Sequence, residues 1–247
     1  MKKTIYILIL LIFACNSEDA NDCFQTTGTI IQEEAEVSNF EKIIVNRGVE
    51  LIITKTSEYK VIIETGENLI NDVKAEVVDN QLVLTDDNNC NYVRDYGNTK
   101  VYVEAPNLTE IINSSQYEVS SNGVLSYQSL RLLSEDYNQD VDFTVGDFRL
   151  SVNSENLEIL SNNISSFYID GATENLFVGF FAGSGRFEGE HLAAQHIELS
   201  HRGSNDMIVN PIQSLTGIIR GTGDVIAVNE PPLIDVERIY TGQLFFE

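Results

Sequence analysis

Three histidines follow one another at intervals of five residues, and histidine is a common ligand of transition metals. They are His191, His196 and His201. On a strand an odd spacing places neighbours on opposite faces, so only His191 and His201 could share a face, and a turn is expected between them. We therefore predict surface or corner histidines rather than a metal site, and we expect no metal or cofactor.

Known catalytic motifs are absent from the 247 residues of the sequence. It has no Gly-x-Ser-x-Gly nucleophile elbow, no HExxH zinc motif and no phosphate-binding loop. The 38 Asp and Glu residues could supply a carboxylate pair for glycoside cleavage. However, the chain has no Trp, and its repeat region has few Lys or Arg residues to hold a sugar polymer. We predict no catalytic residues, and a polysaccharide-cleaving enzyme on a β-helix is the enzymatic alternative.

The N-terminus has the features of a bacterial lipoprotein signal peptide over residues 1–14. Lys2 and Lys3 precede an apolar segment that is too short to span a bilayer. The following Ile-Phe-Ala-Cys sequence resembles a lipobox and ends at Cys15. We predict that Cys15 carries lipid, which would anchor the protein to a membrane without a spanning helix. A cleaved signal without lipid is the alternative.

Residues 15–22 form a polar, acidic segment that we interpret as a flexible tether. The segment resembles the acidic signal that follows the lipid-bearing cysteine in surface-exposed lipoproteins of the Bacteroidetes group. This favours an outer-membrane lipoprotein exposed on the cell surface. A lipoprotein that faces the periplasm is the alternative.

Cys23 and Cys90 are the two remaining cysteines. Outside the cytoplasm a pair of cysteines usually forms a disulfide, because the compartment is oxidising, so we predict a Cys23–Cys90 bridge. A metal site would require a CxxC motif or a neighbouring histidine, and both are missing. The segment 86–91 is rich in side-chain oxygens, but its spacing does not match a calcium-binding EF-hand, so we expect a solvated loop.

Three segments between Glu174 and Val228 share a layout with a period of about 20 residues. Each has an apolar run, a glycine-bearing turn and a second apolar run, and repeats this short must stack to bury their apolar faces. The pattern predicts an all-β, parallel β-solenoid of short strands, with an antiparallel β-sandwich as the alternative. We expect the turns to need residues that tolerate positive φ. The predicted turn residues are Gly183, Gly185, Gly203, Gly221, Gly223 and Asp224.

Alternation of apolar and polar residues predicts strands outside these repeats as well. Residues 68–77 are expected to contain at most one helical turn. The period slips over residues 148–171, which we interpret as a coil with inserted residues, and residues 233–247 are expected to close or cap the last coil. The further predicted strands or coil starts are residues 42–45, 49–54, 59–64, 81–85, 100–104, 108–112, 130–133 and 140–145.

The charge of the chain is strongly acidic. Lys and Arg total 15 against 38 Asp and Glu, which gives a net charge of -23 and excludes nucleic acid as a natural partner, since its phosphates would be repelled. No linker rich in Pro, Gly or Ser divides the chain after the tether. We therefore predict one domain over residues 23–247.

Several segments resemble a known family. They are residues 22–28 after the lipobox, residues 40–43, 48–54 and 89–94, and the Gly-Ser-Gly and Gly-Thr-Gly-Asp turns. From about Cys23 to the C-terminus the chain resembles the "putative auto-transporter adhesin, head GIN domain" family of Bacteroidetes lipoproteins. The resemblance implies a right-handed parallel β-helix-like fold and a cell-envelope location, and it supplies no catalytic residues.

These observations together favour a non-enzymatic binding or adhesion module at the cell surface. Its partners would be the membrane, through the N-terminal lipid, and a glycan or protein ligand. A periplasmic envelope-structure protein that contacts other lipoproteins is the second hypothesis.

Overall fold

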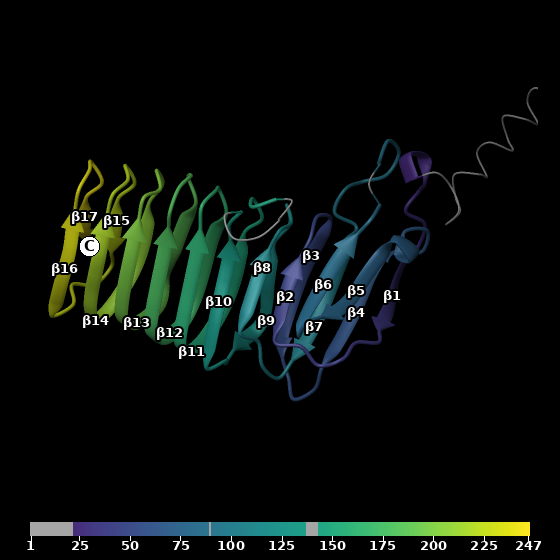
Figure 1. Ribbon diagram of the computed structural model, residues 1–247, viewed down its shortest axis with the longest axis horizontal. Helices are drawn as coiled ribbons and strands as arrows, with labels where there is room; N and C mark the ends of the chain where they lie inside the picture. The colour runs from purple at the N-terminus through teal and green to yellow at the C-terminus, as the bar shows by residue number, and fades with distance from the viewer. Residues whose placement is uncertain (1–21, 89, 137–142) are drawn as a thin grey trace, which may run out of the picture.

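The computed structural model describes residues 22–88, 90–136 and 143–247. Within these residues the chain forms β-strands joined by turns, together with the short 3-10 helices η1 (Asp22–Phe24) and η2 (Ile70–Asp72). The strands stack into one elongated body (Figure 1), which confirms the predicted all-β fold. The predicted signal peptide and lipidation site lie outside the described residues. No helix in the described part of the chain has the length and apolar character of a membrane span.

Strand boundaries follow the apolar alternation of the sequence, and the five strands predicted before residue 106 are present within two residues at each end. η2 is the single helical turn expected within residues 68–77, most of which form a strand. The strands are β1 (Ile30–Ala35), β2 (Lys42–Val45), β3 (Val49–Lys55), β4 (Lys60–Gly66), β5 (Val73–Val78), β6 (Gln81–Asp86), β7 (Thr99–Ala105), β8 (Glu110–Asn113), β9 (Val119–Leu125), β10 (Ser129–Ser134), β11 (Phe148–Ser161), β12 (Ser166–Phe180), β13 (Arg186–His201), β14 (Met207–Ile219), β15 (Val225–Ala227), β16 (Leu233–Arg238) and β17 (Leu244–Phe246).

The long strands β11 to β14 define the repeat, and each is divided into two halves. β11 pairs with β9 through its first half and with β10 through its second, and β12 to β14 continue both pairings. Neighbours are parallel, so Phe148 lies beside Phe167 and Leu157 beside Leu176. Hydrogen-bonded residues of successive coils are 18 to 21 positions apart, in agreement with the predicted period. The parallel register rules out an antiparallel sandwich for these strands.

The core lies between two walls, which are formed by the first halves and the second halves of the long strands. Phe148 of the first wall and Ile159 of the second are both fully buried in one continuous apolar cluster. Equivalent side chains stack from coil to coil, and the Phe148 and Phe167 rings are stacked at a centroid distance of 4.8 Å. Since no repeat encloses a core alone, this stacking supplies most of the apolar burial.

The period is broken between β10 and β11. Arg131 lies 21 residues after its partner Glu110 but 27 residues before its partner Glu158, so the extra residues lie between the two strands. Within residues 148–171 the predicted slip is present only as local irregularities. β11 and β12 pair at a constant offset, but the register shifts between Arg149 and Ser151 against β9 and between Tyr168 and Gly171 against β13. Many of the polar residues in this range are outward positions on β11 and β12, while Ser161 is buried and residues 162–165 form the turn between the two strands. The described part of the predicted strand 140–145 is not a strand, and the remainder lies outside the described residues.

One coil is out of sequence order. β2 pairs with β6 on one side and with β8 on the other, both in parallel, so that Lys42 lies between Gln81 and Glu110. β3 lies in the same way between β7 and β9. The coil formed by β2 and β3 is therefore first in the sequence but is inserted between two later coils, as Figure 1 shows.

Antiparallel strands form the N-terminal end of the stack. β4 pairs with β1 and β7, and β5 pairs with β6 through a hairpin whose two turn residues, Asp79 and Asn80, have φ of 50° and 65°. Such left-handed residues match the twist of a two-residue hairpin. The predicted disulfide is present: Cys23 is bonded to Cys90 with a Cα–Cα distance of 4.4 Å, and it ties η1 to the loop before β7.

The last coil is formed by β16 and β17, which add in parallel to β14 and β15. The inward side chains of this coil are partly exposed. Ile234 is 39% accessible and Phe246 is 38% accessible. The equivalent residues one coil earlier, Leu215 and Ala227, are fully buried. Residues 233–247 thus extend the stack by one coil, and the described residues contain no element that covers their outer edge.

Candidate binding face

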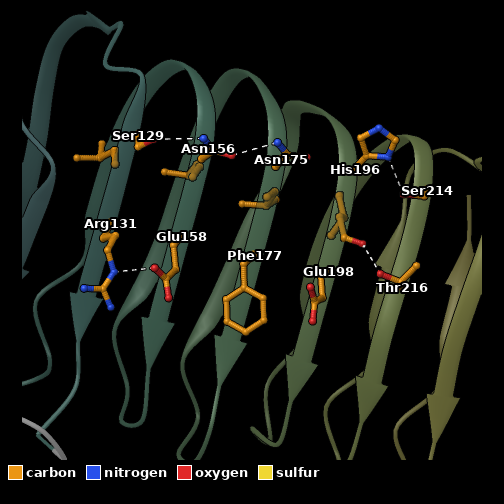
Figure 2. A pocket seen from close by; sticks show the side chains of 14 residues that line it. Ser129, Arg131, Asn156, Glu158, Asn175, Phe177, His196, Glu198, Ser214 and Thr216 are labelled. Carbon is orange, nitrogen blue, oxygen red and sulfur yellow. Dashed lines mark hydrogen bonds and ion pairs between the residues drawn. The ribbon is translucent and has the colours of Figure 1, made fainter.

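A groove of about 670 Å³ crosses five strands of the second wall. It is formed by β10 and by the second halves of β11, β12, β13 and β14 (Figure 2), and we call this surface the groove face. Because the strands are parallel and in register, equivalent residues project side by side in rows. The first row is Ser129, Asn156, Asn175, His196 and Ser214, and the second is Arg131, Glu158, Phe177, Glu198 and Thr216.

The first row is ordered by hydrogen bonds that run across the strands. Asn156 Nδ2 donates to Ser129 Oγ at 3.2 Å, and Asn175 Nδ2 donates to Asn156 Oδ1 at 3.1 Å. His196 Nδ1 lies 2.9 Å from Ser214 Oγ. These contacts fix the side chains on the coil spacing and leave each amide with further donor or acceptor capacity. The row therefore offers a preformed series of polar groups to a ligand.

The second row begins with a doubly paired arginine. Arg131 Nε donates to Glu158 and its Nη1 donates to Glu110, both at 2.6 Å. Glu110 is buried, whereas Glu158 and Arg131 are partly exposed. Such charge-assisted bonds are shorter and stronger than neutral ones, so the carboxylate of Glu158 is held in place.

Acidic groups dominate the electrostatics of the groove face. Arg131 is the one Lys or Arg among its lining residues, and two carboxylates already neutralise it. Glu198 is exposed and forms no hydrogen bond or ion pair with any described side chain. On a chain with a net charge of -23, this surface repels polyanions and suits uncharged or cationic ligands.

The predicted turn glycines stack at the corners of the coils, away from the groove. Gly183 has φ of +80°, which fits the predicted conformational reason. For Gly221 and Gly223 that reason is wrong, because close approach of the backbone is what requires glycine. A Cβ would lie 2.1 Å from Gly203 O at Gly221 and 2.0 Å from Asn205 O at Gly223. Gly185 and Gly203 complete the same corner without positive φ.

Asp224 has a structural position in the same corner. Its Oδ1 accepts a hydrogen bond from the backbone N–H of Gln243 at 2.8 Å. Its own N–H donates to Asp206 Oδ1 at 3.0 Å, and Ser166 N–H donates to Asp147 Oδ1 at 2.7 Å in an earlier coil. Each aspartate thus binds the backbone of the next coil and sets the register between coils.

The three histidines are not brought together. All lie on β13, where His191 is exposed, His196 lies in the groove and His201 is buried. The expectation that His191 and His201 could share a face is wrong, because the register of β13 shifts between them, at Ala194 to His196, and leaves His191 exposed and His201 buried. The described residues contain no group of three or more His, Cys, Asp or Glu residues with metal-binding geometry.

The residues of the groove face were not singled out from the sequence. They project outward, so they carry no apolar periodicity, and their rows appear only when the coils are aligned in register. One signal was available. Glu158, Phe177, Glu198 and Thr216 each follow an inward Leu or Ile by one residue, so superposing the repeats would have placed them in one row.

Comparison with known proteins gives one family. A family model described as "Putative auto-transporter adhesin, head GIN domain" matches residues 39–231. No curated protein sequence matches the chain.

Several solved structures have a similar fold. A "putative adhesin" from Bacteroides fragilis has a TM-score of 0.79 and 19% identity, and the match covers 90% of this chain and 99% of that one. A "putative lipid binding protein" from Parabacteroides distasonis has a TM-score of 0.63 and 15% identity, with 90% and 98% covered. A "putative adhesin" from Parabacteroides merdae has a TM-score of 0.58 and 17% identity, with 90% and 98% covered. Identities this low establish the fold alone.

Proposed function

Because the chain belongs to the "Putative auto-transporter adhesin, head GIN domain" family, we propose that it is a non-enzymatic binding module of the cell envelope. Its ligand, a glycan or a protein, contacts the groove face. The observation that carries this proposal is the pair of side-chain rows in Figure 2, which run across five coils, are partly ordered by hydrogen bonds and are mostly accessible to solvent. Open, extended surfaces of stacked repeats commonly serve as binding surfaces.

The non-enzymatic part of the proposal is tested by product formation. Purified protein without its signal peptide is incubated with microbial and host polysaccharides, and new reducing or unsaturated ends are measured. The proposal predicts none above the level of a heat-denatured sample. Ends that disappear in Glu158→Gln or Glu198→Gln would support the polysaccharide-cleaving alternative instead.

The envelope location of the proposal rests on residues 1–22. Cys15 carries lipid, the acidic tether follows it, and the protein is displayed on the outer face of the outer membrane. Labelling with a fatty-acid analogue should mark the wild type and not Cys15→Ala. Protease treatment of intact cells should remove the protein while sparing a periplasmic control. Protection of the protein until the envelope is opened would favour the periplasmic structural role.

The proposed winding of the coils is that of a right-handed parallel β-solenoid. The parallel register between coils supports it, since right-handed crossovers between parallel strands are the strong rule in proteins. An experimental electron-density map that shows left-handed coils would refute this part of the proposal.

A further inference from the structure

The groove face carries aromatic side chains that the core does not use. The inward ladder positions hold Phe148, Phe167 and Phe187, which are fully buried. Phe177 instead projects outward from β12 within a row of polar side chains and is only half-buried. Phe181 follows in the next turn, outside the residues that line the groove, and is 45% exposed. Single exposed apolar side chains are common on protein surfaces, whereas contiguous ones can mark contact surfaces.

Gly179 brings these two rings together. It occupies the next outward position after Phe177 on β12. A Cβ at this position would lie 2.7 Å from Phe181 Cζ and 2.9 Å from Phe177 Cε1. Because glycine has no side chain, the strand ring and the turn ring both extend over its backbone and form one apolar surface. We call Phe177 and Phe181 the aromatic platform.

Two carboxylates flank the platform. Glu158 precedes Phe177 by one coil and Glu198 follows it by one coil, and Figure 2 shows the ring between them. Arg131 holds Glu158 by a 2.6 Å hydrogen bond. Glu198 has no hydrogen bond or ion pair with any described side chain and is exposed. One acceptor is therefore fixed in position, and the other is available to a ligand.

We infer that the aromatic platform, with Glu158 and Glu198, is a subsite for one sugar ring of an uncharged polysaccharide. The inference rests on the proposed binding function and names its ligand class. An aromatic ring packs against the C–H face of a sugar, while the carboxylates accept hydrogen bonds from its hydroxyls. Apolar contact with a few convergent polar groups is the usual composition of a small-molecule subsite.

The surroundings of the subsite favour a polysaccharide over a monosaccharide and disfavour an anionic polysaccharide. The row of Ser129, Asn156 and Asn175 continues the hydrogen-bonding surface past the platform, so an extended polymer makes more contacts than a monosaccharide. The acidic surface repels sulfated or uronic-acid polymers.

The test measures binding of purified protein, without its signal peptide, to laminarin, mannan and chitin hexamer by biolayer interferometry. Polygalacturonate serves as the anionic glycan, and hexalysine as a cationic peptide. At least one neutral glycan should bind, and Phe177→Ala should raise its Kd about 10-fold or more. Glu198→Gln should raise the Kd less, and Phe245→Ala, an exposed aromatic residue outside the groove, should leave it unchanged. Since Glu198 is exposed, its variant keeps the test valid even if Phe177→Ala misfolds.

The outcomes separate the subsite from the binding function. Failure of every neutral glycan to bind, or tighter binding of polygalacturonate or hexalysine, overturns the subsite. If wild type and Phe177→Ala bind intact bacterial cells equally well, the subsite is overturned while the proposed function stands. If the wild type binds neither cells nor glycans, both are overturned.

Discussion

The imidazole of His201 is fully buried at the end of β13, against the Phe180 ring at a centroid distance of 6.3 Å. Neither ring nitrogen makes a hydrogen bond of good geometry with a described residue, although the Asn205 backbone lies close enough to influence the ring. Burial lowers the pKa of His201, and the Asn205 backbone and the carboxylates of Asp206 and Asp224 oppose this only in part. The ring is therefore neutral in the folded protein at neutral pH.

This position predicts a pH-dependent stability. As the pH falls through the ordinary histidine pKa of 6.5, the unfolded state binds a proton that the folded state does not. The free energy of unfolding should fall between about pH 7 and about pH 5.5, and His201→Leu should remove that part of the fall. It should also stabilise the protein by about 1 to 3 kcal/mol at neutral pH, because a buried unpaired polar group is lost. Urea denaturation at each pH measures both effects.

The control for this prediction is His191→Gln, which changes an exposed histidine on the same strand. It should keep the wild-type pH dependence. A wild-type slope in His201→Leu would contradict the assignment.

Gly223 provides a test of backbone stacking at the corners. A Cβ there would lie 2.0 Å from Asn205 O and 2.6 Å from His201 Nε2, so the coils must separate locally. Gly223→Ala should lower the free energy of unfolding by about 3 kcal/mol. Gly123→Ala is the matched control, because Gly123 has φ of +90° but open space around it, and it should cost about 1 kcal/mol. Equal losses of unfolding free energy in the two variants, measured by chemical denaturation, would contradict a cost that comes from the close backbone contact at Gly223.

At the scale of single residues, the sequence predicted the turn glycines and the disulfide better than the groove. Gly221 and Gly223 repeat at the coil period, and their position is readable even though the reason for glycine is a contact with another coil. Phe177 and Glu198 have no such signature. Their proximity depends on a register that only the folded chain shows.

Among the elements, the antiparallel N-terminal end depends on a covalent tie. The Cys23–Cys90 bridge closes a segment of 67 residues that contains β1 to β6. The double variant Cys23→Ser with Cys90→Ser should lower the free energy of unfolding by about 2 to 4 kcal/mol. Hydrogen exchange should accelerate in β1 and β4 and stay unchanged in β12 and β13, which serve as the internal control. Uniform acceleration along the chain would contradict a local role.

Strand positions could be predicted from alternation, but the order of the coils could not. β2 and β3 carry the same apolar pattern as β6 and β7, so nothing local says which coil lies where. Pairings across 68 residues, such as Lys42 with Glu110, are decided by the fit of whole coils. The larger insertion lies before β11 rather than within residues 148–171, because polar residues on the outward side of β11 and β12 resemble a loop in the sequence.

At the scale of the whole molecule, the stack turns a short repeat into a long surface. In-register parallel strands place one side chain per coil at the strand spacing of about 4.8 Å, so five coils present an extended and rigid array. A mutation anywhere in the array should alter the affinity for an extended ligand, whereas the first wall should tolerate equivalent changes.

β11 offers a matched pair of residues to test this. Asn156 is exposed on the groove face, and Asn153 is exposed on the first wall of the same strand. Binding of fluorescently labelled protein to intact bacterial cells and to immobilised mucin is measured for Asn156→Arg and Asn153→Arg, which add the same bulk and charge. The account predicts that Asn156→Arg lowers binding about 10-fold or more and that Asn153→Arg binds like the wild type. Equal binding by both variants, or no binding by the wild type, would contradict it.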